Sequence, residues 1–296
     1  MIDMLIPQRR RDLGGFEVGR VLPHPRQRMV GPFIFFDHMG PVRFPAGIPR
    51  STDVRPHPHI GLSTITYLFA GEIMHRDSVG SVQPILPGEV NWMTAGRGIT
   101  HSERFERARR EGGPMDGIQA WVALPQADEE CDPGFDHYGS GELPQLDDGG
   151  LRARVVAGTA YGMTAPVRTH SPLFYVHGEL QAGTAMPVPS GYAQRAVYVV
   201  SGDVLVDGTP VAAGQMAVLR VGSESSVTAS TPAVVMLLGG QPVGERFIDW
   251  NFVSSSRERI EQAKADWTAG RMKLPDADDQ EFIPLPGSPA SPEPMS

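Results

Sequence analysis

Two short pairs of residues have the side chains and the spacing of metal ligands. His57-Pro58-His59 and His101-Ser102-Glu103 supply three imidazoles and one carboxylate, which are groups that a borderline transition metal takes up. Residues two apart in a β-strand point to the same face, so each pair would present both of its groups on one side. Two such pairs on neighbouring strands would meet at one ion. For either pair taken alone, the alternative is a surface or hydrogen-bonded core position.

The segment that carries these pairs is expected to consist of short strands joined by glycine turns. His57 and His59 have the same strand parity as Ile65, Tyr67 and Phe69. Because side chains alternate along a strand, we expect all five on one interior face, with small residues near the ligands and larger ones farther along. This arrangement leaves room for a pocket beside the ion.

Two other histidines near the pairs are not expected to bind the ion. His38 follows a short buried strand at Phe33–Phe36, and Asp37–Pro41 has the composition of a turn. We therefore expect a turn histidine at position 38; the alternative is a group that supports a ligand. His75 is separated from the pairs by turns, and we expect it outside the set of ligands. Arg104–Met115 is expected to be a charged loop.

The second half of the chain repeats the first in outline. Thr66–Ile73 matches Val197–Val204 in residue type, position for position, and similarly spaced glycines follow in both halves. Counting from these glycines gives the residues that correspond to the four ligand candidates: Val188, Ser190, Val227 and Ala229. None is a usual metal ligand. The second unit is thus expected to keep the scaffold without the site.

Composition and length favour an all-β protein with many short strands. The 296 residues include 34 Gly and 28 Pro, with 40% hydrophobic and 20% charged residues. We expect an N-terminal metal-binding domain at 1–130, a polar connection with the start of a second unit at 131–170, and a C-terminal domain at 171–272. A helix is expected at Arg257–Trp267, after serine caps, and a disordered tail at 273–296.

Charge and cysteine content limit the partners and the compartment. The formal net charge of −8 argues against a general nucleic-acid surface, which needs clustered Lys and Arg. Cys131 is the single cysteine, so no internal disulfide forms, as is usual in a reducing compartment. The N-terminus does not match a secretory signal, and no apolar run reaches membrane-spanning length. The expectation is a cytoplasmic protein that binds neither membrane nor nucleic acid directly.

The motifs around the ligand candidates resemble those of the pirin family, two-domain members of the cupin superfamily. The resemblance covers most of the N-terminal half and rests on four segments: Pro32–Pro41, Arg55–Gly61, His75–Ser78 and Pro87–Glu103. It implies two tandem cupin barrels, which are double-stranded β-helices of jelly-roll type, with a short C-terminal helix. In a generic cupin the carboxylate ligand would fall at Thr64, whereas the pirin pattern places it at Glu103. This departure favours pirin over a generic cupin.

The resemblance also implies a ligand set and a chemistry. His57, His59, His101 and Glu103 would bind one divalent metal, usually Fe(II), with Mn, Co, Ni, Cu or Zn as alternatives. The implied activity is that of a quercetin 2,3-dioxygenase, which opens the ring of a flavonol with O2 and releases carbon monoxide. Glu103 is our candidate for the base that takes the proton of the flavonol 3-hydroxyl group.

Two other functions stay open at this point. One is a non-catalytic regulator that binds a protein partner according to the state of its metal, as the resemblance to eukaryotic pirins suggests. The other is a metalloenzyme that acts on another small substrate. Strand position and the resemblance make Phe35, Met93 and Gln119 candidates for the pocket wall, and each of them would serve equally as ordinary core.

Overall fold

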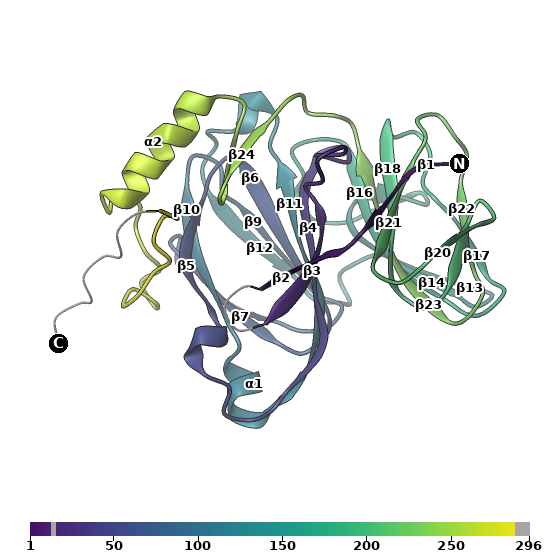
Figure 1. Ribbon diagram of the computed structural model, residues 1–296, viewed down its shortest axis with the longest axis horizontal. Helices are drawn as coiled ribbons and strands as arrows, with labels where there is room; N and C mark the ends of the chain where they lie inside the picture. The colour runs from purple at the N-terminus through teal and green to yellow at the C-terminus, as the bar shows by residue number, and fades with distance from the viewer. Residues whose placement is uncertain (13–15, 288–296) are drawn as a thin grey trace.

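The strands form two barrels that lie side by side (Figure 1). The structure is a computed structural model, and it describes residues 1–12 and 16–287. Each barrel combines a larger and a smaller antiparallel sheet. The all-β fold with two tandem cupin barrels is therefore confirmed. No helix in the described part of the chain is long and apolar enough to cross a membrane.

The first barrel carries the candidate ligands. Its larger sheet has the order β12-β9-β6-β11-β4-β3-β2, and its smaller sheet has the order β5-β10-β7-β8. The strands are β2 (Arg9–Asp12), β3 (Glu17–Leu22), β4 (Phe33–Phe44), β5 (Val54–His59), β6 (Leu62–Ala70), β7 (Ile73–Asp77), β8 (Val82–Ile85), β9 (Val90–Thr94), β10 (Ile99–Arg104), β11 (Gly113–Ala123) and β12 (Gly134–Tyr138). Short helices lie between them: η1 (Arg50–Thr52), α1 (Glu106–Glu111) and η2 (Gln126–Asp128).

The second barrel has a similar pair of sheets. Their orders are β1-β21-β18-β23-β16-β14-β13, with β15 beside β14, and β17-β22-β19-β20. The strands are β1 (Ile2–Pro7), β13 (Gln145–Asp148), β14 (Leu151–Ala160), β15 (Met163–Thr164), β16 (Leu173–Leu180), β17 (Ala185–Pro187), β18 (Gln194–Ser201), β19 (Val204–Val206), β20 (Thr209–Val211), β21 (Gln215–Leu219), β22 (Ser226–Ala229) and β23 (Ala233–Gly240).

Strand pairing divides the chain differently from the expected boundaries. β1 pairs with β21, so the first strand of the chain completes a sheet of the second barrel. β12 pairs with β9 in the first barrel, whereas β13 and β14 belong to the second. The expected 1–130 and 131–170 segments therefore each contribute to both barrels. The sequence of a strand does not indicate which distant strand it pairs with, so these boundaries could not be predicted from local sequence patterns.

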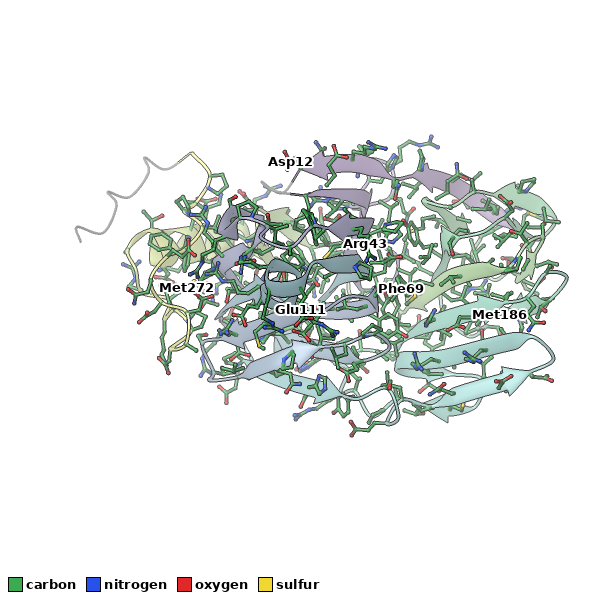
Figure 2. All side chains as sticks on the ribbon, turned by 90° about the horizontal axis from the view of Figure 1, so that it is seen from below. Asp12, Arg43, Phe69, Glu111, Met186 and Met272 are labelled. Carbon is green, nitrogen blue, oxygen red and sulfur yellow. The ribbon has the colours of Figure 1, made fainter. Side chains whose placement is uncertain are left out.

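The two larger sheets share a core where the barrels meet. Phe36 and Tyr67 from the first barrel pack with Tyr175 and Tyr198 from the second. β16, β18 and β23 are buried on both faces, which explains their nearly continuous apolar sequences. Phe69 also lies at this junction (Figure 2).

The expected common face for the ligand pair and the residues of β6 is wrong. Ile65 and Tyr67 face the core between the barrels, not the interior that holds His57 and His59. The chain passes from the smaller to the larger sheet at Gly61, so strand parity is not carried across. Gly61 has φ +67°, and a Cβ there would lie 2.0 Å from the carbonyl oxygen of Val253. Only glycine fits this crossing.

Two other local predictions are also wrong. Asp37–Pro41 lies within β4, where Gly40 has a positive φ and the pairing with β11 shifts register. A bulged strand accommodates Gly and Pro, and these residues had suggested a turn. His38 is consequently buried in a strand. The expected loop at Arg104–Met115 contains the short helix α1.

The C-terminal segment returns to the first barrel. It forms the hairpin β24 (Phe247–Asp249) and β25 (Phe252–Ser254), and then the expected helix α2 (Arg257–Thr268). Ser256 caps α2 by accepting a hydrogen bond from the backbone N–H of Arg259, and Trp267 is among its buried residues. Residues 273–287 then pack against the first barrel, unlike the expected disordered tail; the expectation for 288–296 lies outside the described residues.

Candidate metal centre

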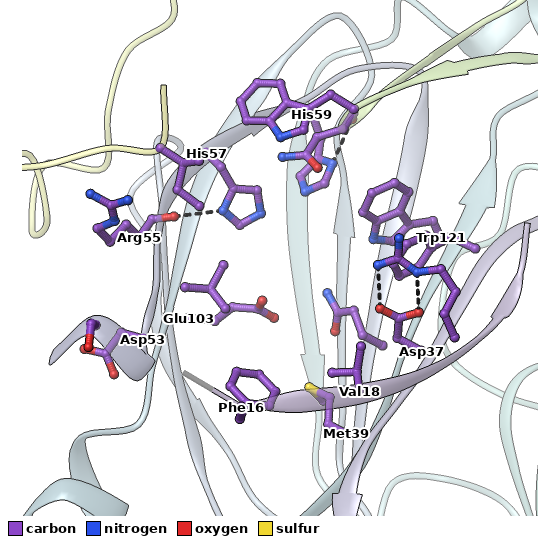
Figure 3. Close-up of a pocket in the computed structure, with 18 of the residues that line it drawn as sticks. Phe16, Val18, Asp37, Met39, Asp53, Arg55, His57, His59, Glu103 and Trp121 are labelled. Carbon is purple, nitrogen blue, oxygen red and sulfur yellow. Dashed lines mark hydrogen bonds and ion pairs between the residues drawn. The ribbon is translucent and has the colours of Figure 1, made fainter. Parts of the chain in front are cut away.

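Three of the predicted ligands come together inside the first barrel. His57 on β5 pairs directly with His101 on β10, and His59 lies two residues farther along β5. One nitrogen from each ring lies within 4.8 Å of the other two, and all three side chains are buried. Figure 3 shows His57 and His59 with Glu103 around one cavity. The two-residue spacing thus places the imidazoles together, as expected for strands.

The Nδ1 atoms of the β5 histidines are held by carbonyl groups. Nδ1 of His57 lies 2.9 Å from the carbonyl oxygen of Arg55, and Nδ1 of His59 lies 3.0 Å from that of Asn251. A carbonyl oxygen only accepts hydrogen bonds, so each Nδ1 carries the proton. This tautomer leaves the lone pair on Nε2, which is the state that a metal ligand needs.

A second histidine holds the ring of His101. Nδ1 of His101 lies 3.4 Å from Nδ1 of His75, and Nε2 of His75 lies 2.9 Å from a carboxylate oxygen of Asp77. Asp77 also accepts hydrogen bonds from the backbone N–H groups of Val79 and Ser81, which fix its position. With its proton directed at Asp77, His75 accepts from His101 and leaves Nε2 of His101 unprotonated. His75 therefore lies behind the cluster and orients one of its rings.

Burial keeps the three imidazoles neutral. It lowers the pKa of His57 to about 4, and it lowers those of His59 and His101 well below the usual value. Nε2 of His59 lies 3.2 Å from Nε2 of His101. Two ligands of one ion, each about 2.1 Å from it, lie at roughly this separation. Two lone pairs that face each other are explained by a shared cation, so the residues present fit a metal ion.

Glu103 lines the same cavity but lies outside the compact cluster. Among the described residues, the group close enough to share an ion comprises the three histidines. A carboxylate oxygen of Glu103 lies 3.4 Å from Oγ1 of Thr66, which in turn lies 2.8 Å from the side chain of Gln119. Burial raises the pKa of Glu103 to about 7, although the hydrogen bonds from Thr66 and Gln119 oppose this effect.

The cavity beside the histidines has a volume of about 960 Å³, which is the size of a pocket for a drug-sized ligand. Phe35 and Trp121 stack on its wall, with ring centroids 4.0 Å apart and an angle of 13° between the planes. Arg20 lies over Phe35, 4.4 Å from the ring centroid, and makes two hydrogen bonds of 2.8 Å to Asp37. A flat aromatic wall beside neutral imidazoles suits a planar aromatic ligand.

Of the three pocket candidates, the structure places Phe35 and Gln119 on the cavity wall. Met93 instead belongs to a buried apolar cluster around the site. Trp121 was missed, although it follows Gln119 at strand spacing and that signal would have found it. Asn251 was also missed, and no local signal points to it, because it lies 192 residues from His59 in the chain.

Comparison with known proteins agrees with this architecture. Residues 15–122 match the pirin family model, and residues 175–273 match the model of the pirin C-terminal cupin domain. A pirin-like protein of Caulobacter vibrioides is 62% identical over 97% of this chain and 100% of its own length. The chain belongs to the pirin family. Residues 274–287 of this pirin lie outside both family models.

Solved structures of relatives have the same fold. The crystal structure of a quercetin 2,3-dioxygenase from Acinetobacter baumannii is 34% identical, with a TM-score of 0.88 over 97% of this pirin and 96% of that chain. The bacterial pirin YhhW from Escherichia coli, solved in complex with nickel(II), is 18% identical, with a TM-score of 0.64 over 82% of this chain and 100% of that one. The second likeness concerns the fold alone.

Proposed function

We propose that this pirin is a mononuclear metal-dependent dioxygenase that opens the ring of quercetin-like flavonols with O2 and releases carbon monoxide. The observation that carries the proposal is the convergence of three buried, neutral imidazoles at one end of a cavity with a stacked aromatic wall. The relative from Acinetobacter baumannii that is named a quercetin 2,3-dioxygenase supports the same chemistry.

The ligand set in this proposal is His57, His59, His101 and Glu103. The expected ion is Fe(II), with Mn, Co, Ni, Cu and Zn as alternatives. When bound, the ion supplies Lewis-acid and redox chemistry toward the flavonol and O2. Glu103 belongs to the set because it is buried on the same strand as His101 and lines the same cavity as His57 and His59.

The remaining steps fall to side chains of the cavity. The stacked pair of Phe35 and Trp121 orients the flat ring system of the flavonol. Glu103 takes the proton of the 3-hydroxyl group, and Thr66 and Gln119 hold its carboxylate in place.

The test uses protein loaded anaerobically with one metal at a time. After quercetin and O2 are added, we expect O2 uptake matched by carbon monoxide release in at least one metal form. Glu103→Gln, compared at equal metal content, should lose most of the turnover. Undiminished turnover in that variant would overturn the role of Glu103 as base.

A protein inactive with Fe, Mn, Co, Ni and Cu would contradict the dioxygenase proposal and favour a metal-dependent interaction protein. O2 uptake with a different small substrate, and none with quercetin, would instead favour a related metalloenzyme.

A further inference from the structure

The segment after α2 lies along the two strands that carry the candidate ligands. We call residues 273–287 the strap; it is part of the yellow segment beside β5 and β10 in Figure 1. The backbone N–H of Ile283 donates to the carbonyl oxygen of Pro56 at 2.8 Å, and Oγ1 of Thr100 donates to the carbonyl oxygen of Lys273 at 2.5 Å. Pro56 and Thr100 directly precede His57 and His101, so the strap contacts both ligand strands.

Asp278 anchors the strap to the outer face of β10. Its carboxylate accepts two hydrogen bonds of 2.7 Å from the guanidinium group of Arg104 and one of 2.6 Å from Oγ of Ser102. Ser102 and Arg104 alternate with His101 and Glu103, so one face of β10 holds the site and the other holds the strap. The side chain of Arg104 is only 2% exposed. A buried guanidinium with a bidentate partner forms a strong and directional contact.

The strap also reaches the cavity itself. Glu281 and Ile283 line the cavity together with Ile248 and Trp250 of the preceding segment. The indole N–H of Trp267 donates to the carbonyl oxygen of Ile283 at 3.0 Å, so α2 supports this wall from behind. The backbone at Ile283 is therefore held on two sides while its side chain faces the cavity. Neither family model extends to this part of the wall.

We propose that the strap determines which ligands the metal cavity accepts, with Ile283 as its contact residue and Asp278 as the anchor that keeps the wall closed. The inference rests on the proposed function for the identity of the ligand, a flavonol. Ile283 packs against the ring system of quercetin, and the closed strap excludes flavonols that are enlarged by a sugar. Neither residue takes part in the reaction itself, so substitutions at both positions should change the affinity for the flavonol.

Three variants distinguish the effect of losing the anchor, the effect of losing the contact and the effect of an unrelated substitution in the strap. Asp278→Ala removes the anchor. Ile283→Ala shortens the contact side chain and keeps both hydrogen bonds of the backbone. Asp276→Ala is the matched control, because Asp276 lies in the same strap and pairs only with the exposed Lys273 among the described residues.

The measurement is anaerobic fluorescence titration of the metal-loaded protein with quercetin and with quercetin 7-O-glucoside. Ile283→Ala should weaken quercetin binding at least about tenfold, since the loss of methylene contact in a hydrophobic pocket has this effect. Asp278→Ala should weaken it to a similar extent, because the wall that carries Ile283 is no longer held closed. Both should also reduce the preference for quercetin over the glucoside, and Asp276→Ala should behave as the native protein. If the native protein binds quercetin and all three variants match it in affinity and preference, the strap proposal is overturned while the proposed function stands.

A second measurement needs no flavonol. Hydrogen exchange at the amide of Ile283 and acrylamide quenching of tryptophan fluorescence report the opening of the strap directly. Both should increase in Asp278→Ala relative to Asp276→Ala. If native protein binds no flavonol with any metal, the proposed function fails, and the strap is judged on these two measurements. Equal exchange and equal quenching in the two variants would overturn the strap as a closing wall.

Discussion

The two barrels have the same sheet arrangement but differ in what their smaller sheets enclose. In the first barrel, His57 on β5 faces His101 on β10 beside a large cavity. In the second barrel, Met186 on β17 faces Val227 on β22, and both are fully buried in an apolar cluster. Figure 2 shows Met186 among the strands of this second barrel. The scaffold therefore folds around an apolar interior as readily as around a polar site, and the histidines are not needed for the fold.

The register of these strands also corrects the count made from the sequence. With Val227 opposite Met186, the residue that corresponds to His57 is Met186, and Val188 corresponds to His59. The count from the turn glycine had assigned Val188 to His57, two residues away. The error arises because the connection that precedes β18 is longer than the one that precedes β6. The conclusion that the second barrel lacks ligands does not change.

The largest expected effect comes from one substitution at matched positions in the two barrels. His101→Ala should reduce bound metal from one ion per chain to below about a tenth of that value, because one imidazole of a small ligand set is lost. Val227→Ala should leave bound metal unchanged and lower the free energy of unfolding by about 2 kcal/mol, since it opens a cavity in a packed core. Elemental analysis and denaturant unfolding measure both. Equal metal loss in the two variants would contradict the division between barrels.

A smaller effect is expected from the support behind His101. Asp77→Asn should weaken metal binding by about 10- to 100-fold, because His75 loses the carboxylate that fixes its tautomer. Asp116→Asn is the matched control: Asp116 lies 2.7 Å from Nε2 of His38 in a similar pair at the junction of the barrels. Competition with a metal indicator measures the affinity. If both variants bind the ion as tightly as native protein, His75 does not orient His101.

Much of the site was predictable because its chemistry depends on local spacing. Residues two apart on one strand share a face in any sheet, so the common orientation of His57 and His59 could be predicted without knowledge of the fold. The prediction of helix α2 also depended on local sequence features, namely its serine cap and the spacing of its buried residues.

The parts that were missed depend on contacts between distant segments. Asn251 holds His59 and Ile283 lines the cavity, yet both follow the second barrel in the chain. The local sequence patterns around these two residues do not indicate that the chain returns to the first barrel there. Met93 shows the converse problem: its strand position suited the pocket as well as the core, and the structure places it in the core.

The second barrel also has a buried histidine, and it is expected to make folding sensitive to pH. Burial, together with the charges of Arg154 and Arg152, lowers the pKa of His177 to about 3. The folded protein keeps this ring neutral, whereas the unfolded chain takes up a proton below about pH 6.5. His177 therefore lowers stability as pH falls, by about 2 kcal/mol between pH 7 and pH 5, and the loss levels off below about pH 3.

His177→Gln should remove this contribution, so its unfolding free energy should fall less steeply with pH than that of native protein. The histidines of the metal site contribute equally to both proteins and cancel in the comparison. Denaturant unfolding of the metal-free proteins at pH 7, 6 and 5 gives the two slopes. Parallel slopes would show that His177 does not differ in protonation between the folded and unfolded chains.

The smallest expected effect concerns α2, which covers the first barrel; in the described part of the chain no helix covers the second barrel in the same way (Figure 1). Oγ of Ser256 accepts a hydrogen bond of 3.2 Å from the backbone N–H of Arg259, a first-turn group that has no other acceptor among the described residues. Ser256→Ala should lower the free energy of unfolding by about 1 kcal/mol, whereas Ser256→Asn should keep most of it, since asparagine caps helices as well as serine does. Bound metal should not change in either variant, because the cap lies outside the metal site. A loss of metal in Ser256→Ala alone would show instead that α2 and the hairpin before it hold His59 through Asn251, and that the cover of the first barrel is part of its site.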